Sequence, residues 1–251
     1  MNTLKKHRCR LLKTGLHNGF YNMALDQALL EAVAGGFSPP VLRFYGWKPA
    51  AVSLGYFQRI EDEVDVQACQ RRQVDIVRRL SGGGAVFHHA ELTYSIILGA
   101  AHPLAGTGIQ DSYRMLCAGI VRGLGLLGVD AVFAPINDIL AGGRKVSGNA
   151  QTRRMGGVLQ HGTVLLDSDL DLMFELLKVP DVKISRDHRI RDVKERVTSL
   201  KALLGREVSF EEAEAAMARG FCESLSLDML EDEPPLPRET EEQRAWELSQ
   251  P

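Results

Sequence analysis

The sequence predicts an α+β fold in which a mixed β-sheet is flanked by helices. Segments with helical periodicity alternate irregularly with short apolar segments that have the length of strands. Several strand-like segments follow one another through short turns, so a regular repeat of strand, helix and parallel strand is not indicated. The 251 residues fit one large domain of this class or two small ones, and no internal repeat is visible.

The N-terminal half opens with a helix that is followed by pairs of strands. The first helix ends before Gly35-Gly36, a pair typical of a helix terminus. Two strands, 41–47 and 51–57, flank Lys48-Pro49, which predicts a hairpin. Two later strands, 74–79 and 91–98, are separated by the turn Ser81-Gly82-Gly83-Gly84. The predicted elements are helix 18–33, strands 41–47 and 51–57, helix 64–72, and strands 74–79 and 91–98.

The C-terminal half is predicted to contain a long helix, three extended segments and two further helices. Gly119, Gly123 and Gly125 are expected to loosen the long helix. Ser209 with Glu212 three residues later forms a capping box, which marks the start of the last helix. The predicted elements are helix 109–127, extended segments 130–133, 139–146 and 158–166, and helices 169–177 and 209–225.

Composition excludes several classes of protein. A net charge of −2 provides no global field that would attract nucleic acid or a membrane surface. The four cysteines are scattered without a Cys-x-x-Cys pair, so neither a structural zinc site nor a disulfide framework is indicated. No apolar run approaches the length of a membrane span, and reduced thiols in the cytoplasm are expected.

The C-terminal end differs in composition from the rest of the chain. From Glu231 the sequence is acidic and rich in proline, which predicts a solvated tail. We therefore expect a folded domain over residues 1–227 and an acidic tail over residues 228–251 that is too short to be a further, accessory domain.

The first candidate site follows the strand predicted at 74–79. Three successive glycines, Gly82-Gly83-Gly84, can turn several backbone N–H groups toward one point and form an anion-binding nest. Arg79 can add a bidentate contact to a phosphate or carboxylate. A tight turn beside surface arginines remains the alternative. The segment is neither a P-loop, because no Gly-Lys-Ser/Thr follows, nor a dinucleotide fingerprint, because no helix opens after the glycines.

The second candidate site centres on Lys145, which has glycines on both sides and Asn137-Asp138 before it. Lysine is a compact positive charge that can be placed against a phosphate or carboxylate. The alternative is a hairpin that turns at Gly142-Gly143 and exposes a basic pair. Because two glycine-rich basic loops occur in one domain, we expect them to converge on one anionic small molecule.

Histidines supply a third candidate. His161 lies in a strand-like run beside Gly162, where it can be a hydrogen-bonded core residue or a catalytic one. His88 and His89 point to opposite faces of a strand, so they do not form a metal site together. No Gly-x-Ser-x-Gly elbow occurs and no cysteine lies in the glycine-rich segments, so a covalent route has no evident nucleophile.

Together these three segments resemble the lipoate–protein ligases, within the superfamily of biotin and lipoate ligases. The motifs occur in the family's order: Arg78-Arg79-x-Ser-Gly-Gly-Gly-Ala-Val-Phe-His, then Asn-Asp-x5-Gly-Arg-Lys-x-Ser-Gly-Asn-Ala-Gln, then Leu-Gln-His-Gly-Thr-x-Leu-Leu-Asp. The resemblance covers roughly residues 10–227. It implies a mixed sheet flanked by helices, with a cleft where ATP activates lipoate, or octanoate, as acyl-AMP.

The resemblance also implies roles for individual residues. Lys145 would be catalytic, contacting the acyl carbonyl and the α-phosphate, and Asp138 would contact Mg²⁺. The ATP and lipoyl-AMP site would be lined by Arg79, Ser81, Gly82, Gly83, Gly84, Ala85, Val86, Phe87, His88, Asn137, Asp138, Gly148, His161 and Gly162. Strand alternation suggests that the apolar acyl tunnel is formed by Val52, Leu54, Val86 and Leu165.

The activity expected from this resemblance is an ATP-dependent lipoate–protein ligase that acylates a lysine of a lipoyl carrier domain. Expected acceptors are a 2-oxoacid dehydrogenase subunit, the glycine-cleavage H protein or a lipoate-binding protein. A separate small accessory subunit is a further candidate partner, and a self-sufficient catalytic domain is the alternative. Octanoyltransferases of this superfamily use a cysteine just upstream of the Gly-Arg-Lys segment, and none stands there. The alternatives are an ATP-independent octanoyl or lipoyl transferase between carrier proteins and a non-catalytic lipoate-binding module.

Overall fold

The computed structural model describes residues 6–106, 108–167, 169–178 and 195–231. Its elements, in chain order, are β1 His7–His17, α1 Gly19–Ala34, β2 Val41–Trp47, β3 Ala51–Leu54, α2 Ile60–Glu63, α3 Val66–Arg72, β4 Asp75–Arg78, β5 Val86–His88, β6 Glu91–Gly99, the 3-10 helix Pro103–Ala105, α4 Ile109–Leu126, β7 Ala131–Ala134, β8 Asp138–Ala141, β9 Arg144–Arg154, β10 Gly157–Leu165, α5 Leu170–Leu176, α7 Leu200–Leu204, α8 Phe210–Leu225 and β11 Leu227–Glu231.

The strands form a large sheet and a small one. The large sheet has the order β11-β1-β2-β6-β10-β9-β8-β7, and the small sheet has the order β4-β3-β5. In the large sheet β1 pairs in parallel with both β11 and β2, and the remaining pairs are antiparallel. This mixed sheet confirms the predicted fold class.

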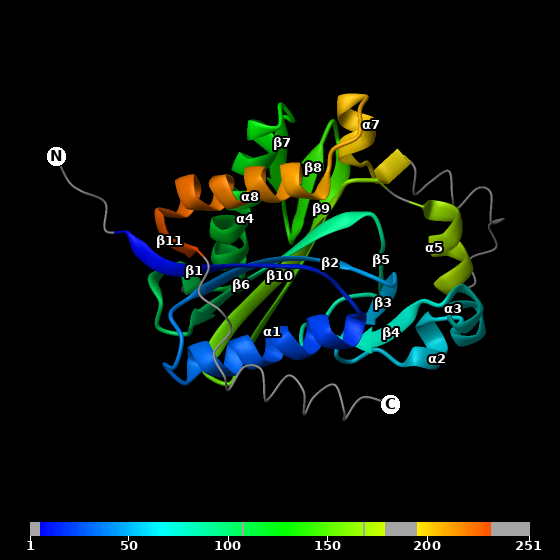
Figure 1. Ribbon diagram of the computed structural model, residues 1–251, viewed down its shortest axis with the longest axis horizontal. Helices are drawn as coiled ribbons and strands as arrows, with labels where there is room; N and C mark the ends of the chain where they lie inside the picture. The colour runs from blue at the N-terminus through cyan, green and yellow to red at the C-terminus, as the bar shows by residue number, and fades with distance from the viewer. Residues whose placement is uncertain (1–5, 107, 168, 179–194, 232–251) are drawn as a thin grey trace.

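Helices cover both faces of the large sheet, with α8 and α4 on one side and α1 on the other (Figure 1). The main apolar core lies between the sheet and the α4–α8 pair, and a second core lies under α1. The small sheet packs at one end with α3 and α5 and has its own apolar cluster. The two sheets meet where β3 and β5 face the ends of β2 and β6 (Figure 1).

Gly119 and Gly123 of α4 serve packing, contrary to the sequence-based prediction that they loosen the helix, whereas a Cβ atom at Gly125 would meet nothing within 4 Å. A Cβ atom at Gly119 would lie 2.4 Å from the Phe221 ring, and one at Gly123 would lie 2.6 Å from the Met217 sulfur. Gly220 of α8 meets the backbone of Gly119 in the same way. The missing side chains let α4 and α8 approach closely, which is why their contact surface is buried.

The cap at Ser209 agrees with the sequence-based prediction, and the cap at Asn18 was not predicted. Asn18 caps α1 by accepting from Tyr21 N–H, and Ser209 caps α8 by accepting from Glu212 N–H. These side chains satisfy backbone donors that have no partner inside the helix.

Several predicted joins differ from the structure. The segments flanking Lys48-Pro49 form no hairpin, because β2 belongs to the large sheet and β3 to the small one. The extended segment predicted at 139–146 is two strands, β8 and β9, and the short strand β5 precedes β6. Strand β1 was not predicted. Its pattern of side chains is irregular because the strand contains a register shift between Lys13 and Gly15.

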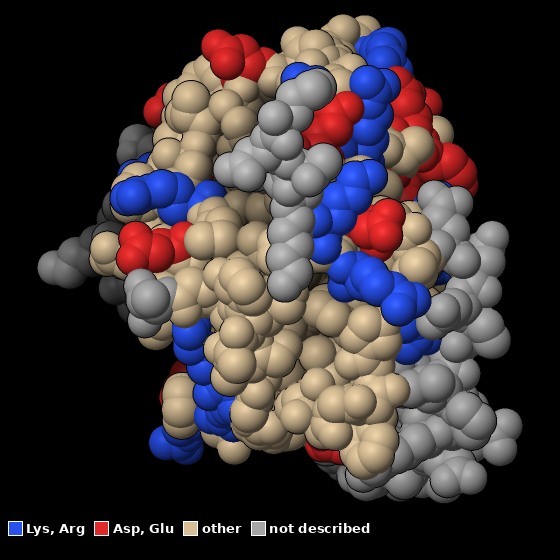
Figure 2. Space-filling view, turned by 90° about the vertical axis from the view of Figure 1, so that its left-hand side faces the viewer, with Lys and Arg blue, Asp and Glu red and all other residues tan. Residues whose placement is uncertain are grey.

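The domain boundary drawn at residue 227 falls inside strand β11, which extends the large sheet to Glu231. Residues 232–251 of the predicted tail lie outside the described part of the chain. Among the described residues, no helix combines the length and apolarity that crossing a lipid bilayer requires. On the face shown in Figure 2, basic and acidic side chains lie interspersed, as the small net charge leads one to expect.

Candidate active site

A cavity of about 580 Å³ opens where the small sheet meets the large one, a size typical of small-molecule sites. The residues that line it come from both sheets, from α1, α4 and α5, and from the glycine-rich loop. They are Met23, Tyr45, Trp47, Ser53, Arg79, Gly82, Gly83, Gly84, Ala85, Val86, Phe87, His88, Glu91, Thr93, Tyr113, Asn137, Lys145, Gly148, Asn149, Ala150, Gln151, His161, Gly162, Thr163, Leu165, Met173, Leu177 and Val197.

Arg79 organises the glycine-rich loop. Its Nη2 donates to the carbonyls of Gly82 (2.9 Å) and Gly84 (2.7 Å), and its Nε donates to Ser81 Oγ at 3.2 Å. Its Nη1 donates to Ser53 O (2.9 Å) and Ser53 Oγ (3.1 Å). A guanidinium has five N–H donors, so these contacts occupy all of them. Burial lowers the pKa of Arg79 to about 10, which still leaves it charged at neutral pH.

The loop leaves backbone donors for a ligand. The N–H groups of Gly82, Gly83 and Gly84 donate no hydrogen bond within the described residues, and all three glycines line the cavity. Gly83 has a φ of +98°, in the region that favours glycine. A Cβ atom at Gly55 would lie 2.1 Å from Gly83 O, so this second glycine lets the loop settle against β3. The loop therefore has the N–H groups, unpartnered among the described residues, that the predicted anion nest requires.

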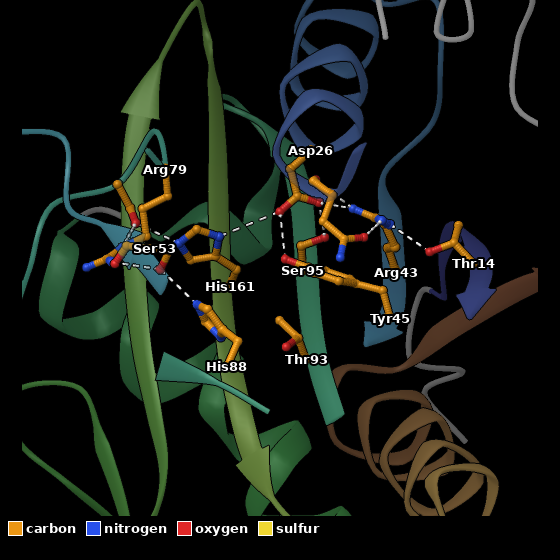
Figure 3. Close-up of polar contacts among 12 residues, drawn as sticks. Thr14, Asp26, Arg43, Tyr45, Ser53, Arg79, His88, Thr93, Ser95 and His161 are labelled. Carbon is orange, nitrogen blue, oxygen red and sulfur yellow. Dashed lines mark hydrogen bonds and ion pairs between the residues drawn. The ribbon is translucent and has the colours of Figure 1, made fainter. Parts of the chain in front are cut away.

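Behind the loop, Ser53, His88 and Glu91 form a hydrogen-bonded chain, which we call the Ser53 relay. Ser53 Oγ lies 2.7 Å from His88 Nε2, and His88 Nδ1 lies 2.7 Å from Glu91 Oε1 (His88 and Ser53 are labelled in Figure 3). The same Glu91 oxygen accepts from Thr93 at 2.8 Å. The Trp47 ring stacks on His88 with centroids 4.0 Å apart, which fixes the plane of the imidazole.

A second chain, the Ser81 relay, consists of Ser81, His161 and Asp26. Ser81 Oγ lies 2.6 Å from His161 Nε2, but His161 Nδ1 lies 3.6 Å from Asp26 Oδ2 (Figure 3). Desolvation lowers the pKa of His161, which keeps the ring neutral at neutral pH. Burial alone would raise the pKa of Asp26, but His161 and Arg43 outweigh it and hold that pKa below its ordinary value.

Asp26 is committed to an arginine. Arg43 is fully buried and donates to Asp26 Oδ1 at 2.8 Å and to Asn22 Oδ1 at 2.7 Å. Tyr45 and Ser95 also donate to the two carboxylate oxygens of Asp26, at 3.1 and 2.8 Å. A buried charge of this kind is stable only when it is paired and hydrogen-bonded.

Lys145 projects into the cavity from β9. Its Nζ lies 2.6 Å from Asp138 Oδ1, and both side chains are about one-third exposed, at 38% and 35%. A Cβ atom at Gly148 would lie 2.7 Å from Lys145 Cε, so Gly148 makes room for the lysine side chain. Gly142 and Gly143, with φ of +56° and +75°, form the β8–β9 turn, which is the hairpin alternative considered for this segment.

Asn137 and Asn149 form hydrogen bonds beside Lys145 in the wall of the cavity. Asn149 Oδ1 accepts from Tyr94 Oη at 2.7 Å, and Asn149 Nδ2 donates to Asn137 O at 2.9 Å. A Cβ atom at Gly162 would lie 2.1 Å from Asn149 Oδ1. Gly162 therefore lets Asn149 lie flat across β10, beside His161.

The structure brings most of the predicted site residues together. Ser81 is fully buried behind the loop and Asp138 lies behind Lys145, so neither belongs to the cavity wall. Of the predicted acyl tunnel, Val86 and Leu165 line the cavity. Val52 and Leu54 were predicted wrongly, because they pack in the small-sheet core. Strand alternation could not show which face of β3 meets the cavity.

Sequence reasoning missed the apolar floor and the Ser53 relay. The floor is formed by Met23, Tyr45 and Trp47, which pack together around the sheet junction. Tyr45 and Trp47 lie at the end of a predicted strand. Nothing in the adjacent sequence indicates that this strand end lies where the two sheets meet. Ser53 lies in a run that was predicted as a strand and that resembles the family, but no role was assigned to its hydroxyl.

No cysteine lines the cavity. Burial raises the pKa of Cys9 and of Cys117 to about 12, and that of Cys69 to about 11. Within the described ranges, no three His, Cys, Asp or Glu side chains are placed to hold a metal ion. Asp138, the predicted Mg²⁺ contact, is paired with Lys145. These residues do not fit a resident metal site.

The catalytic-domain model of the lipoyl protein ligases A and B matches residues 18–222. The chain is 37% identical over 247 residues to the octanoyltransferase LipM of Geobacillus kaustophilus, which covers 89% of this chain and 88% of the relative. It is 40% identical over 238 residues to the octanoyltransferase LipM of Kyrpidia tusciae, covering 86% of each.

Solved structures show the same fold. A bipartite lipoate protein ligase of Thermoplasma acidophilum, studied with its E2 lipoyl domain, superposes with a TM-score of 0.84. It is 32% identical, and the match covers 98% of this chain and 93% of that one. A biotin protein ligase of Aquifex aeolicus, 11% identical with a TM-score of 0.50 over 86% of this chain and 70% of that one, shares the fold alone.

These relatives overturn the expected ATP-dependent ligase activity. These and other curated relatives that the chain matches over most of their length are named octanoyltransferases, which corresponds to the alternative considered above. The ligase prediction relied on the missing cysteine upstream of Lys145. That absence excludes one covalent route only, because a hydroxyl nucleophile can also accept an acyl group.

Proposed function

The chain belongs to the lipoyl protein ligase A/B catalytic-domain family, and within it we propose an acyltransferase that works without ATP. The enzyme takes an octanoyl group from the thioester of one carrier protein and transfers it to a lysine of a lipoyl domain. The observation that carries this proposal is the identity of 35–40% to octanoyltransferases over nearly the whole of both chains. Protein lipoylation is thus the process in which it acts.

The cavity suits an acyl chain with a reactive end. Met23, Tyr45 and Trp47 supply an apolar floor, while Lys145 and the N–H groups of the glycine-rich loop lie on its polar wall. Such a site buries hydrocarbon and leaves the carbonyl among donors. A lipoyl group has the same eight-carbon acid chain, so the same cavity would take it as well.

A thioester donor removes the need for adenylation. The carbonyl of a thioester is already activated, so the protein has to stabilise only the negative charge that develops on its oxygen during attack. The protonated Lys145 and backbone N–H groups in a partly closed cavity serve this purpose, and one such donor commonly contributes about 10²- to 10³-fold. Asp138, 2.6 Å away, holds the ammonium group in place.

A lipoyl domain is the acceptor that we propose. The similar ligase of Thermoplasma acidophilum was studied with an E2 lipoyl domain. Candidate acceptors are the lipoyl domains of 2-oxoacid dehydrogenases, the glycine-cleavage H protein and lipoate-binding proteins. The amine of the target lysine must reach the cavity in its neutral form, because only that form is nucleophilic.

The test is acyl transfer in ATP-free buffer. The purified protein is incubated with an octanoyl acyl carrier protein and a lipoyl domain, and the acceptor is analysed by intact-mass spectrometry. We expect one octanoyl group per lipoyl domain, none on a lipoyl domain whose target lysine is replaced by arginine, and a loss of about 10²-fold or more for Lys145→Ala. Acylation that requires ATP and free octanoate or lipoate would contradict the proposal.

A further inference from the structure

Acyl transfer between two carriers raises the question of which group holds the acyl chain between them. The cavity contains no thiol, and the cysteines Cys9, Cys69 and Cys117 are buried elsewhere with raised pKa values. It does contain a serine hydroxyl that is hydrogen-bonded to a histidine. Nucleophilic serine, a base and an acid that orients the base form a recurrent arrangement for acyl transfer on unrelated folds.

The contacts of the Ser53 relay assign a direction to its protons. As a carboxylate, Glu91 can only accept, so the 2.7 Å contact places a proton on His88 Nδ1. His88 Nε2 is then an acceptor, and Ser53 donates its O–H to it over 2.7 Å. Trp47 stacks on the ring and Thr93 bonds the same Glu91 oxygen, so neither the ring nor the carboxylate is free to turn.

We propose, on the basis of the acyl transfer proposed above, that Ser53 is the nucleophile and carries the acyl group as an ester. His88 is its general base, and Glu91 positions His88. All three side chains line the cavity that would hold the thioester. Arg79 Nη1, 3.1 Å from Ser53 Oγ, stabilises the negative charge that develops on that oxygen.

The first half-reaction balances without a co-reactant. Ser53 Oγ attacks the thioester carbonyl carbon while its proton passes to His88 Nε2. The carbon–sulfur bond then breaks, and the departing carrier thiolate takes the proton from His88. The products are acyl-Ser53 and a free carrier thiol. The N–H groups of Gly82, Gly83 and Gly84, which have no partner within the described residues, are available for the carbonyl oxygen.

The second half-reaction restores the serine. The neutral amine of the acceptor lysine attacks the ester carbonyl and gives a proton to His88. The bond between the carbonyl carbon and Ser53 Oγ breaks, and the serine oxygen takes that proton back. The net change converts a thioester and an amine into an amide and a thiol, which requires neither ATP nor an oxidant.

The decisive experiment looks for the acyl-enzyme. The full-length protein is mixed with octanoyl acyl carrier protein without an acceptor, quenched with acid, and examined by intact mass and peptide mapping. We expect a single octanoyl group on the peptide that contains Ser53, stable to neutral hydroxylamine because it is an oxygen ester. Ser53→Ala should carry no adduct and should lose transfer by about 10³-fold or more.

Two further variants guard against a folding artefact. Ser53→Cys keeps a nucleophile, so it should still be acylated, now through a thioester that neutral hydroxylamine cleaves. Ser38→Ala is the matched control, because Ser38 Oγ also accepts from an arginine Nη1 at 3.1 Å but lies outside the cavity. It should transfer at the wild-type rate.

The outcomes separate this inference from the proposed function. An octanoyl group on Ser81, Lys145 or a cysteine would overturn it, and so would transfer by Ser53→Ala at a rate near that of the wild type. Transfer that proceeds with no acyl-enzyme would also overturn it while leaving the acyltransferase proposal intact. Absence of any transfer by the wild-type protein would remove both.

Discussion

The Ser53 relay and the Ser81 relay each join a serine, a histidine and an acidic residue, yet their acids differ in what else they bind. Glu91 lies at hydrogen-bond distance from His88, 2.7 Å, and also accepts from the Thr93 hydroxyl. Asp26 lies 3.6 Å from His161 because Arg43, Tyr45 and Ser95 occupy its oxygens. Asp26 shares its oxygens among these groups, so its contact with His161 is the longer of the two contacts between an acid and an imidazole.

The two relays share an arginine but differ in whether their serine reaches the cavity. Both serines also accept from Arg79, so the arginine ties the relays together through the loop. Ser53 faces the cavity whereas Ser81 does not. We therefore expect substitutions in the Ser53 relay to affect transfer and those in the Ser81 relay to affect folding.

The largest expected effect is the loss of transfer activity that the substitution Glu91→Gln causes. The amide can no longer stabilise a positively charged His88, so transfer should fall by about 10²- to 10⁴-fold. The measurement is kcat/KM for octanoyl transfer together with Tm from thermal unfolding. A loss of activity that simply follows a loss of folded protein would show that Glu91 acts only in stability.

The counterpart in the second relay is Asp26→Asn. This change leaves the charge of Arg43 buried without its carboxylate, which typically costs about 3–5 kcal/mol of unfolding free energy. Urea denaturation followed by circular dichroism measures it. As a control, Asp26→Leu combined with Arg43→Met removes both charges and should cost less than the two single changes added together. If Asp26→Asn is as stable as the wild type, the assignment of Asp26 to stability is wrong.

A smaller effect tests the polar wall without touching either relay. Gly148→Ala adds a Cβ atom 2.7 Å from Lys145 Cε, so the lysine side chain must move. Because displacement of a positioned charge weakens its stabilisation of the transition state, we expect kcat/KM to fall by about tenfold. Gly99→Ala is a suitable control, since a Cβ atom there meets nothing within 4 Å. Equal activity of the two variants would argue against a catalytic position for Lys145.

The smallest expected effect is a pH dependence of stability that His161 causes. Burial lowers the pKa of His161 below its ordinary 6.5, so the unfolded chain binds a proton at a higher pH than the folded one. Stability is then complete above pH 6.5 and declines as the pH falls toward the lower folded pKa, by at most about 1.4 kcal/mol per pH unit. His161→Gln should flatten this slope of unfolding free energy against pH, measured by urea denaturation between pH 7 and 5. If the variant and the wild type show the same slope, His161 is not the cause.

The sequence was most informative where a motif is local. The glycine-rich loop, the Lys145 segment and the His161 strand were each recognisable from adjacent residues, and the structure places them around one cavity. The hairpin at Lys48-Pro49 was predicted wrongly because local turn chemistry does not state which sheet a strand joins. The ligase activity was predicted wrongly because a missing thiol was taken as the absence of any nucleophile.

The sequence by itself determined the fold class, the helix cap at Ser209, and the loops that surround the cavity. These features depend on periodicity, capping and turn residues, which act over a few positions of the chain. Only the tertiary structure decided which hydroxyl meets which imidazole. Ser53 and His88 are 35 residues apart and Ser81 and His161 are 80 apart, so sheet register and packing, not local sequence, separate the Ser53 relay from the Ser81 relay.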